Sequence, residues 1–150
     1  MLFPGADLPA LAAIPFMPVE RVERIHPPFS AGSAEALFSH AADSVSEAPA
    51  LMFAHGNGEL ITHNLSVARK LADLGLAVLL AGYPGYGRSD GTPSRRAITE
   101  AFLSGFDWLH ALVQVDQGSI GGFGCSLGAA ALADLAQARS LKALILQSPF

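Results

Sequence analysis

The sequence predicts an α/β fold, a doubly wound and mostly parallel sheet with helices on both faces. Short apolar runs of strand length alternate with longer segments in which apolar residues recur at helical spacing. Glycine-rich corners follow the apolar runs, where the carboxyl ends of parallel strands form functional sites. Charged residues make up only 15% of the chain, as expected when helices cover both faces of a sheet.

The 150 residues fit a single domain, 1–150, incomplete at its carboxyl end, with an irregular leader over 1–18. The leader is apolar but is interrupted by prolines and lacks the positive start of a secretory signal. No stretch reaches the ~20 apolar residues that span a membrane. A single cysteine excludes an internal disulfide. We therefore expect a cytoplasmic protein with no membrane span.

The first part of the domain is expected to hold three strands. Residues 19–27 alternate partly and stop at a proline pair, and residues 35–40 form a second short candidate. Residues 50–54 are a continuous apolar run, which predicts a buried strand. A helix over 61–74 follows, with Gly75 closing it.

The second part continues the alternation of strand and helix. Residues 76–81 predict a buried strand, and a loop then leads to a helix with Thr92 as N-cap and Pro93 in its first turn. Residues 119–123 predict the next strand, and residues 127–138 the next helix.

The most specific motif is Gly124-Cys125-Ser126-Leu127-Gly128, between a predicted strand and a predicted helix. This is a G-x-S-x-G nucleophile elbow, which exposes a serine above the sheet. Gly124 and Gly128 remove side chains where the turn brings the backbone close to its neighbours. Ser126 is therefore the candidate nucleophile, and the N–H of Leu127 is placed to donate to an oxyanion.

A second glycine turn, His55-Gly56-Asn57-Gly58-Glu59, follows the strand over 50–54. Its position predicts the second oxyanion donor, which we assign to the N–H of Asn57. Gly56 lets the backbone turn, and His55 is interpreted as a hydrogen-bonding brace for the turn rather than as the base. Cys125 is expected to be a buried small residue. The remaining histidines are expected to be structural or surface residues: His26, His40, His63 and His110.

Several other classes of function find no support. The net charge is −4 and the basic residues cluster no further than Arg95-Arg96, so a nucleic-acid partner is not expected. Leu127 stands where a dinucleotide-binding fingerprint needs its third glycine, and no Gly-Lys-Ser/Thr sequence is present. No metal-binding spacing of histidine, cysteine or carboxylate occurs, so no metal and no cofactor are expected.

Taken together, the quoted motifs resemble the α/β-hydrolase superfamily. The resemblance rests on residues 55–59, 82–94, 124–128 and 147–150 and covers about residues 19–150. It is greatest with the esterase and serine-aminopeptidase-like branch (peptidase S33-like), which includes the BEM46-type hydrolases. It implies Ser126 as nucleophile and acyl transfer to water from a small-molecule ester, thioester or amide, without a diffusible cofactor or metal.

The sequence departs from the family in the rest of the catalytic triad. The family order is serine, then aspartate or glutamate, then histidine, but the last histidine here is His110. Asp134 is the only acid after Ser126 and lies on the helix after the elbow, where we expect it to have no catalytic role. The chain is thus expected to be the front part of a serine hydrolase. A predicted strand over 142–147 would then form an apolar sheet edge, which favours aggregation.

Three interpretations remain open from the sequence. The first is a serine hydrolase seen in part, the second a non-catalytic hydrolase-like scaffold for binding or assembly, and the third an enzyme whose acid and base come from a partner chain. Leu60, Ile61 and Tyr83 suggest a site that accepts an apolar acyl group. Neither the particular substrate nor the oligomeric state follows from these patterns.

Overall fold

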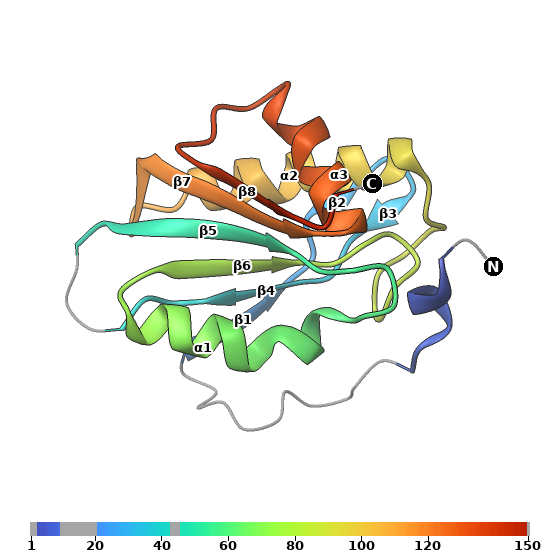
Figure 1. Cartoon of the computed structure of the whole chain (residues 1–150), viewed down its shortest axis with the longest axis horizontal. Coiled ribbons are helices and arrows are strands. Elements are labelled where there is room, and N and C mark those ends of the chain that lie inside the picture. Colours follow the sequence, from blue (N-terminus) through green and yellow to red (C-terminus); the bar gives the residue numbers. More distant parts are fainter. Residues whose placement is uncertain (1–2, 10–20, 43–45, 150) are drawn as a thin grey trace.

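The computed structural model describes residues 3–9, 21–42 and 46–149. Its centre is a six-stranded sheet with the strand order β1-β4-β6-β5-β7-β8 (Figure 1). The strands β6, β5, β7 and β8 run parallel to one another, whereas β4 is antiparallel to both β1 and β6. The strands of this sheet are β1 Val22–Ile25, β4 Ala36–Ser39, β5 Ala48–Ala54, β6 Ala77–Ala81, β7 Val115–Cys125 and β8 Leu144–Gln147. The prediction of a mostly parallel α/β sheet is confirmed.

Helices cover both faces of the sheet (Figure 1). On one face lies α1 (Leu65–Asp73), preceded by the short 3-10 helix η3 (Ile61–Asn64). On the other lie α2 (Arg95–His110) and α3 (Leu127–Ala136). The strands β5 and β6 are buried between these layers, which explains why their sequences are continuously apolar rather than alternating. The apolar core is accordingly divided into two clusters, one on each face.

The register of the parallel strands aligns their carboxyl ends. Ala54 of β5 pairs with Ala81 of β6 on one side and with Gly124 of β7 on the other. The turns that follow these three strands therefore begin at the same level of the sheet. This alignment brings together three segments that the sequence separates by 25 residues or more, and it creates the candidate site.

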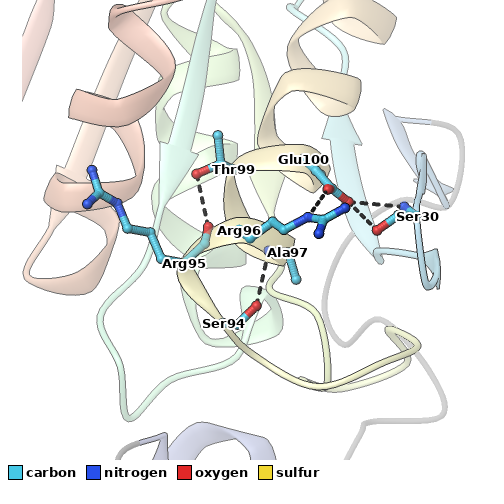
Figure 2. A network of polar contacts seen from close by, with 7 residues as sticks. All are labelled: Ser30, Ser94, Arg95, Arg96, Ala97, Thr99 and Glu100. Atoms are coloured by element: carbon cyan, nitrogen blue, oxygen red, sulfur yellow. Dashed lines mark hydrogen bonds and ion pairs between the residues drawn. The ribbon is translucent and has the colours of Figure 1, made fainter.

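Several element boundaries differ from the predictions. The helix α2 begins after Ser94, whose Oγ accepts a hydrogen bond from the N–H of Ala97 at 3.2 Å, so Thr92 is not its N-cap and Pro93 lies outside it (Figure 2). The loop before the helix is closed by a hydrogen bond from the N–H of Gly85 to the carbonyl of Asp90 at 2.9 Å. The strand β7 begins at Val115, earlier than predicted, because Val115 pairs with Ala48 of β5.

A small second sheet was not predicted. It is a two-stranded antiparallel ribbon formed by β2 (Pro28–Phe29) and β3 (Gly32–Ser33). Its strands have two residues each, too short for any periodic pattern to reveal them.

The predicted leader is only partly covered by the described residues. Within it, Pro4–Asp7 form a 3-10 helix, η1, which lies beside the carboxyl ends of the strands (Figure 1). The N–H of Gly5 donates to the carbonyl of Asn57 at 3.1 Å, so η1 rests on the turn that follows β5. Residues 1–2 and the remainder of the leader from residue 10 lie outside the described residues.

Two surface properties bear on the sequence predictions. Within the described ranges, none of the helices combines the length and the apolar character needed to cross a membrane. The strand β8 occupies one edge of the main sheet, where Ile145 and Leu146 are 57% and 38% exposed. The predicted apolar edge is therefore present.

Candidate active site

The elbow places Ser126 in an unusual backbone conformation. Ser126 joins β7 to α3 with φ 51° and ψ −112°. Among the described residues, only Ser126 and Ser148 are non-glycine residues with positive φ. Such a conformation costs about 1–3 kcal/mol and persists only where the surrounding structure imposes it. The surrounding structure therefore holds Ser126 in this conformation.

The two glycines of the motif are required by close backbone approaches. A Cβ on Gly124 would lie 2.4 Å from the carbonyl oxygen of Gly128. A Cβ on Gly128 would lie 2.1 Å from the carbonyl oxygen of Ala54, the last residue of β5. Both approaches are far inside van der Waals contact. The elbow is consequently packed directly against the strand that leads into the second glycine turn.

Backbone hydrogen bonds hold the elbow on its other side. The N–H of Ser126 donates to the carbonyl of Gln147 at the end of β8 at 2.9 Å, and the N–H of Ala129 donates to the carbonyl of Ser126 at 3.0 Å. Leu127 is the first residue of α3, so its N–H belongs to the first turn, where helix N–H groups have no partner within the helix. The oxyanion role of Leu127 stays a prediction, and this position is compatible with it.

The turn after β5 is held in place through Asn57. The hydroxyl of Tyr86 lies 3.0 Å from the backbone oxygen of Asn57 and 2.5 Å from its Oδ1. Gly5 donates to the same backbone oxygen from η1. Burial raises the pKa of Tyr86, so its hydroxyl remains a donor at neutral pH. The sequence motif contained Tyr86, but no local signal indicated that it would bind this turn.

His55 is buried at the beginning of the turn. Its Nδ1 lies 2.8 Å from the carbonyl oxygen of Gly56, which can only accept, so Nδ1 carries the proton. Burial lowers the pKa of His55 to about 4, which keeps the ring neutral at pH 7. The ring packs on Tyr83 with centroids 4.5 Å apart, and the Tyr83 hydroxyl donates to the His55 carbonyl at 2.5 Å. These contacts bind His55 to its own turn and to the end of β6.

Glu35 anchors the loop that carries Tyr86. Its Oε2 accepts a hydrogen bond from the N–H of Arg88 at 3.0 Å, and its backbone N–H donates to Oγ of Ser89 at 2.8 Å. The carboxylate is buried and lies 3.1 Å from Nε of Arg24. Sequence reasoning missed this role, although an acid at the start of an otherwise apolar strand was an available signal.

The histidines that were expected to be structural or surface residues lie mostly at the surface. His26, His63 and His110 are exposed, and His40 is half-buried. No hydrogen bond joins the Ser126 side chain to a histidine within the described segments. Cys125 was predicted to be buried and is half-buried, because it ends β7 at the site edge of the sheet. In the described part of the chain, no three metal-ligating side chains gather into a group that could hold a metal ion.

Asp134 takes part in an ion pair rather than facing Ser126. Arg95 binds it in a bidentate manner, with Nε 2.9 Å from Oδ2 and Nη2 2.8 Å from Oδ1. These hydrogen bonds hold the pKa of Asp134 below its usual range. Arg95 and Arg96 extend from the first turn of α2 in opposite directions, and Arg96 pairs instead with Glu100 (Figure 2).

The Arg95–Asp134 pair lies at a cavity of about 430 Å³ between α2 and α3. The other residues that line this cavity are Phe3, Ile98, Leu127, Ala130, Ala131 and Ala133. The residues that the sequence suggested for an apolar acyl site do not line it. Leu60, Ile61 and Tyr83 are instead buried in the core, at 4%, 4% and 0% exposure, because they pack under the turns.

Comparison with known sequences finds relatives among hydrolases. The chain is 39% identical over 102 residues to the uncharacterized protein Rv2307c of Mycobacterium tuberculosis, covering 68% of this chain and 36% of that protein. It is 33% identical over 109 residues to the lysophosphatidylserine lipase ABHD12 of Bos taurus, covering 68% and 27%. It is also 33% identical over 105 residues to the α/β hydrolase domain-containing protein WAV2 of Arabidopsis thaliana, covering 68% and 34%. No family model matches the chain.

Solved structures share the fold. The α/β hydrolase GrgF from Penicillium sp. superposes with a TM-score of 0.75 at 22% identity, covering 89% of this chain and 46% of that one. An esterase from Pyrobaculum calidifontis superposes with a TM-score of 0.70 at 25% identity, covering 88% and 46%. The chain spans about a third of the length of the curated relatives and less than half the length of these structures.

Proposed function

Because this chain belongs to the α/β-hydrolase superfamily by its fold and its sequence relatives, we propose that it is the nucleophile-bearing part of a serine hydrolase. The observation that carries the proposal is the conformation of Ser126, at φ 51° and ψ −112° between two sterically required glycines. An ordinary connection from strand to helix has no need of a strained serine. A nucleophile elbow does, since it must expose the hydroxyl above the sheet.

The chemistry proposed is acyl transfer through an acyl-enzyme. Oγ of Ser126 bonds to the carbonyl carbon of an ester, thioester or amide while its proton passes to a general base. The resulting oxyanion collapses, and the leaving group departs with a proton returned by that base. Water then attacks the acyl-enzyme by the same route and releases the acid. One relative is named as a lysophosphatidylserine lipase, which supports a small-molecule acyl substrate.

The oxyanion would be held by the N–H groups of Asn57 and Leu127. The support for this assignment is positional: β5 and β7 pair up to Ala54 and Gly124, so the two turns start side by side. The contacts of Tyr86 and Gly5 to Asn57 limit the movement of its turn. A donor that is already fixed stabilises developing charge without reorganisation, and removal of one such donor costs ~10²–10³ in rate.

The general base and its acid are proposed to come from residues outside this 150-residue segment. No histidine follows Ser126 in the sequence, and Asp134 is occupied by Arg95. Without its base, a serine hydrolase accelerates the reaction only ~10³–10⁴-fold over water. We therefore expect the 150-residue chain by itself to have little acyl-transfer activity.

Labelling with a fluorophosphonate, followed by peptide mapping, tests the proposal. We expect slow labelling confined to Ser126, none in Ser126→Ala, and unchanged labelling in Ser148→Ala. Ser148 is a matched control because it is an exposed serine that also has positive φ, at 48°. Equal labelling of Ser126 and Ser148 would contradict a nucleophile elbow. Rapid stoichiometric labelling would contradict only the expected inactivity of the isolated chain.

A non-catalytic scaffold is the second candidate. The exposed apolar residues Ile145 and Leu146 at the edge of the sheet favour it, since such an edge can pair with another chain. Under this alternative, Ser126→Ala leaves partner binding unchanged. A loss of binding in that variant would count against the scaffold function.

The cytoplasmic location is likewise a proposal, supported by the single cysteine, which leaves no pair for an internal disulfide. Fractionation of the source cells with an antibody to this chain tests it. Recovery with the soluble cytoplasmic fraction is expected, and recovery with secreted or envelope fractions would overturn it.

A further inference from the structure

The cavity between α2 and α3 begins at the residue that follows the nucleophile. Leu127 is both the first residue of α3 and part of the cavity wall. If the N–H of Leu127 holds the carbonyl oxygen of a substrate, the chain attached to that carbonyl carbon lies near the cavity entrance. The cavity therefore lies within reach of the acyl side of the scissile bond.

The walls of the cavity are formed mostly by small and apolar side chains. The helix α3 turns its larger side chains, Leu132 and Leu135, into the core and contributes Ala130, Ala131 and Ala133 to the cavity. Alanine at these positions leaves open the space that a leucine would fill. Ile98 of α2 completes an apolar lining of about 430 Å³.

Among the described residues that line the cavity, the only charged groups are Arg95 and Asp134, and their charges neutralise each other. Arg95 binds both carboxylate oxygens of Asp134, at 2.8 and 2.9 Å. Neither charge is therefore left to attract an ionic ligand into the cavity. A neutral apolar chain can enter without separating the pair, whereas a charged group would lose hydration without gaining a partner.

The amino-terminal segment forms part of the enclosure. Phe3 lines the cavity, and the next residues form η1, which is bonded through Gly5 to the turn of Asn57. A Cβ on Gly5 would approach the Tyr86 ring to 2.2 Å, so this contact is close and specific. Phe3 is thus held over the cavity by a segment that also touches the candidate oxyanion turn.

We propose that this cavity binds the linear apolar acyl chain of the substrate. The inference deepens the proposed function and rests on it, since it identifies the acyl group as a straight hydrocarbon chain. Phe3, Ile98 and Ala130 then determine how long a chain the site accepts. Leu127 links the chain-binding cavity to the reacting carbonyl.

Equilibrium binding of straight-chain carboxylates tests the inference without requiring catalysis. Butanoate, hexanoate, octanoate and decanoate are titrated by calorimetry into the protein and into its Ser126→Ala variant. Affinity is expected to rise by up to about fourfold for each added methylene until the cavity is filled. The rise of affinity with chain length should be the same in Ser126→Ala as in the parent protein, because the Ser126 hydroxyl does not line the cavity.

Two variants localise the binding. Ala130 is exposed and lines the cavity. The side chain introduced by Ala130→Phe should fill the cavity, so that affinity no longer rises with chain length beyond hexanoate. Ala136→Phe is the matched control, because Ala136 lies exposed on the same helix outside the cavity and should change nothing. If Ala130→Phe fails to fold, Phe3→Ala provides a second test. It opens the opposite wall of the cavity and should extend the rise in affinity to longer chains.

The outcomes separate this inference from the proposed function. Affinity that does not rise with chain length, or that rises equally in Ala130→Phe, overturns the acyl-chain site. Ser126 labelled by a fluorophosphonate in such a protein would leave the proposed function standing. A cavity that binds the series in a protein whose Ser126 is never labelled would instead support apolar-chain binding and reject hydrolysis.

Discussion

Tyr86 and Asn57, from the turns after two adjacent strands, are joined by a hydroxyl that reaches both oxygens of the asparagine, at 3.0 Å to the backbone and 2.5 Å to the side chain. The bond links the loop after β6 to the turn after β5. It holds the carbonyl of Asn57 and therefore the plane of the peptide group that joins Asn57 to Gly58. The orientation of the candidate oxyanion turn thus depends on a residue 29 positions away in the sequence.

Replacement Tyr86→Phe should loosen this turn. We expect the free energy of unfolding to fall by about 1 kcal/mol, because one intramolecular hydrogen bond is lost. Labelling of Ser126 by a fluorophosphonate should slow by about tenfold, less than the ~10²–10³ for outright loss of a donor. Urea unfolding and labelling rates measure the two effects. Thr99→Val is the control, since it deletes an exposed hydroxyl-to-carbonyl bond in α2 that is far from the turn in sequence (Figure 2).

Replacement Gly128→Ala should strongly destabilise the fold. The new methyl group would lie 2.1 Å from the carbonyl oxygen of Ala54, and neither backbone segment can move without disturbing β5 or α3. We expect a loss of about 3 kcal/mol or more in the free energy of unfolding. Gly58→Ala is the control, because nothing lies within 4 Å of its added carbon. Equal melting temperatures for the two variants would show that the elbow is not tightly packed.

Stability should depend on pH through His55. Burial lowers its pKa from 6.5 to about 4, so between these values the unfolded chain binds a proton that the folded chain does not. The contribution of His55 to the free energy of unfolding is fully present above pH 6.5 and is lost as the pH falls toward 4. The loss amounts to up to about 1.4 kcal/mol per pH unit. Glu59 and His63 shift this pKa in opposite directions and by less than burial does.

The measurement is urea unfolding at several pH values between 7 and 4, for the parent protein and for His55→Gln. Glutamine can still donate to the Gly56 carbonyl but does not titrate, so its stability should fall less steeply over this range. His110→Gln removes an exposed histidine and serves as the control. Parallel curves for the parent protein and His55→Gln would mean that His55 is not buried in its neutral form.

Replacement Ile145→Lys should reduce self-association. Ile145 is 57% exposed on β8, an edge strand whose outer backbone groups can pair with another chain. A charge on this edge opposes such pairing, so light scattering at high protein concentration should decrease. Val113→Lys is the control, because Val113 is 87% exposed but lies in a connection rather than on a strand edge. Equal effects of both substitutions would indicate a general effect of charge.

The sequence predicted some elements well because their signals are local. The strands β5 and β6 were recognised from continuous apolar runs, and the elbow from glycines at fixed distances from a serine. Local patterns could not predict the ribbon of β2 and β3, whose strands are too short, and they placed the start of α2 at Thr92 rather than after Ser94.

By itself, the sequence determined the alternation of strands and helices, the fold class and the position of Ser126, because each depends on residues adjacent in the chain. Only the tertiary structure decided the antiparallel direction of β4 and the bond from Tyr86 to Asn57. It likewise decided that Asp134 pairs with Arg95 beside an alanine-lined cavity. These features join residues that are distant in sequence, and they exist only once sheet register and helix packing bring their side chains within bonding distance.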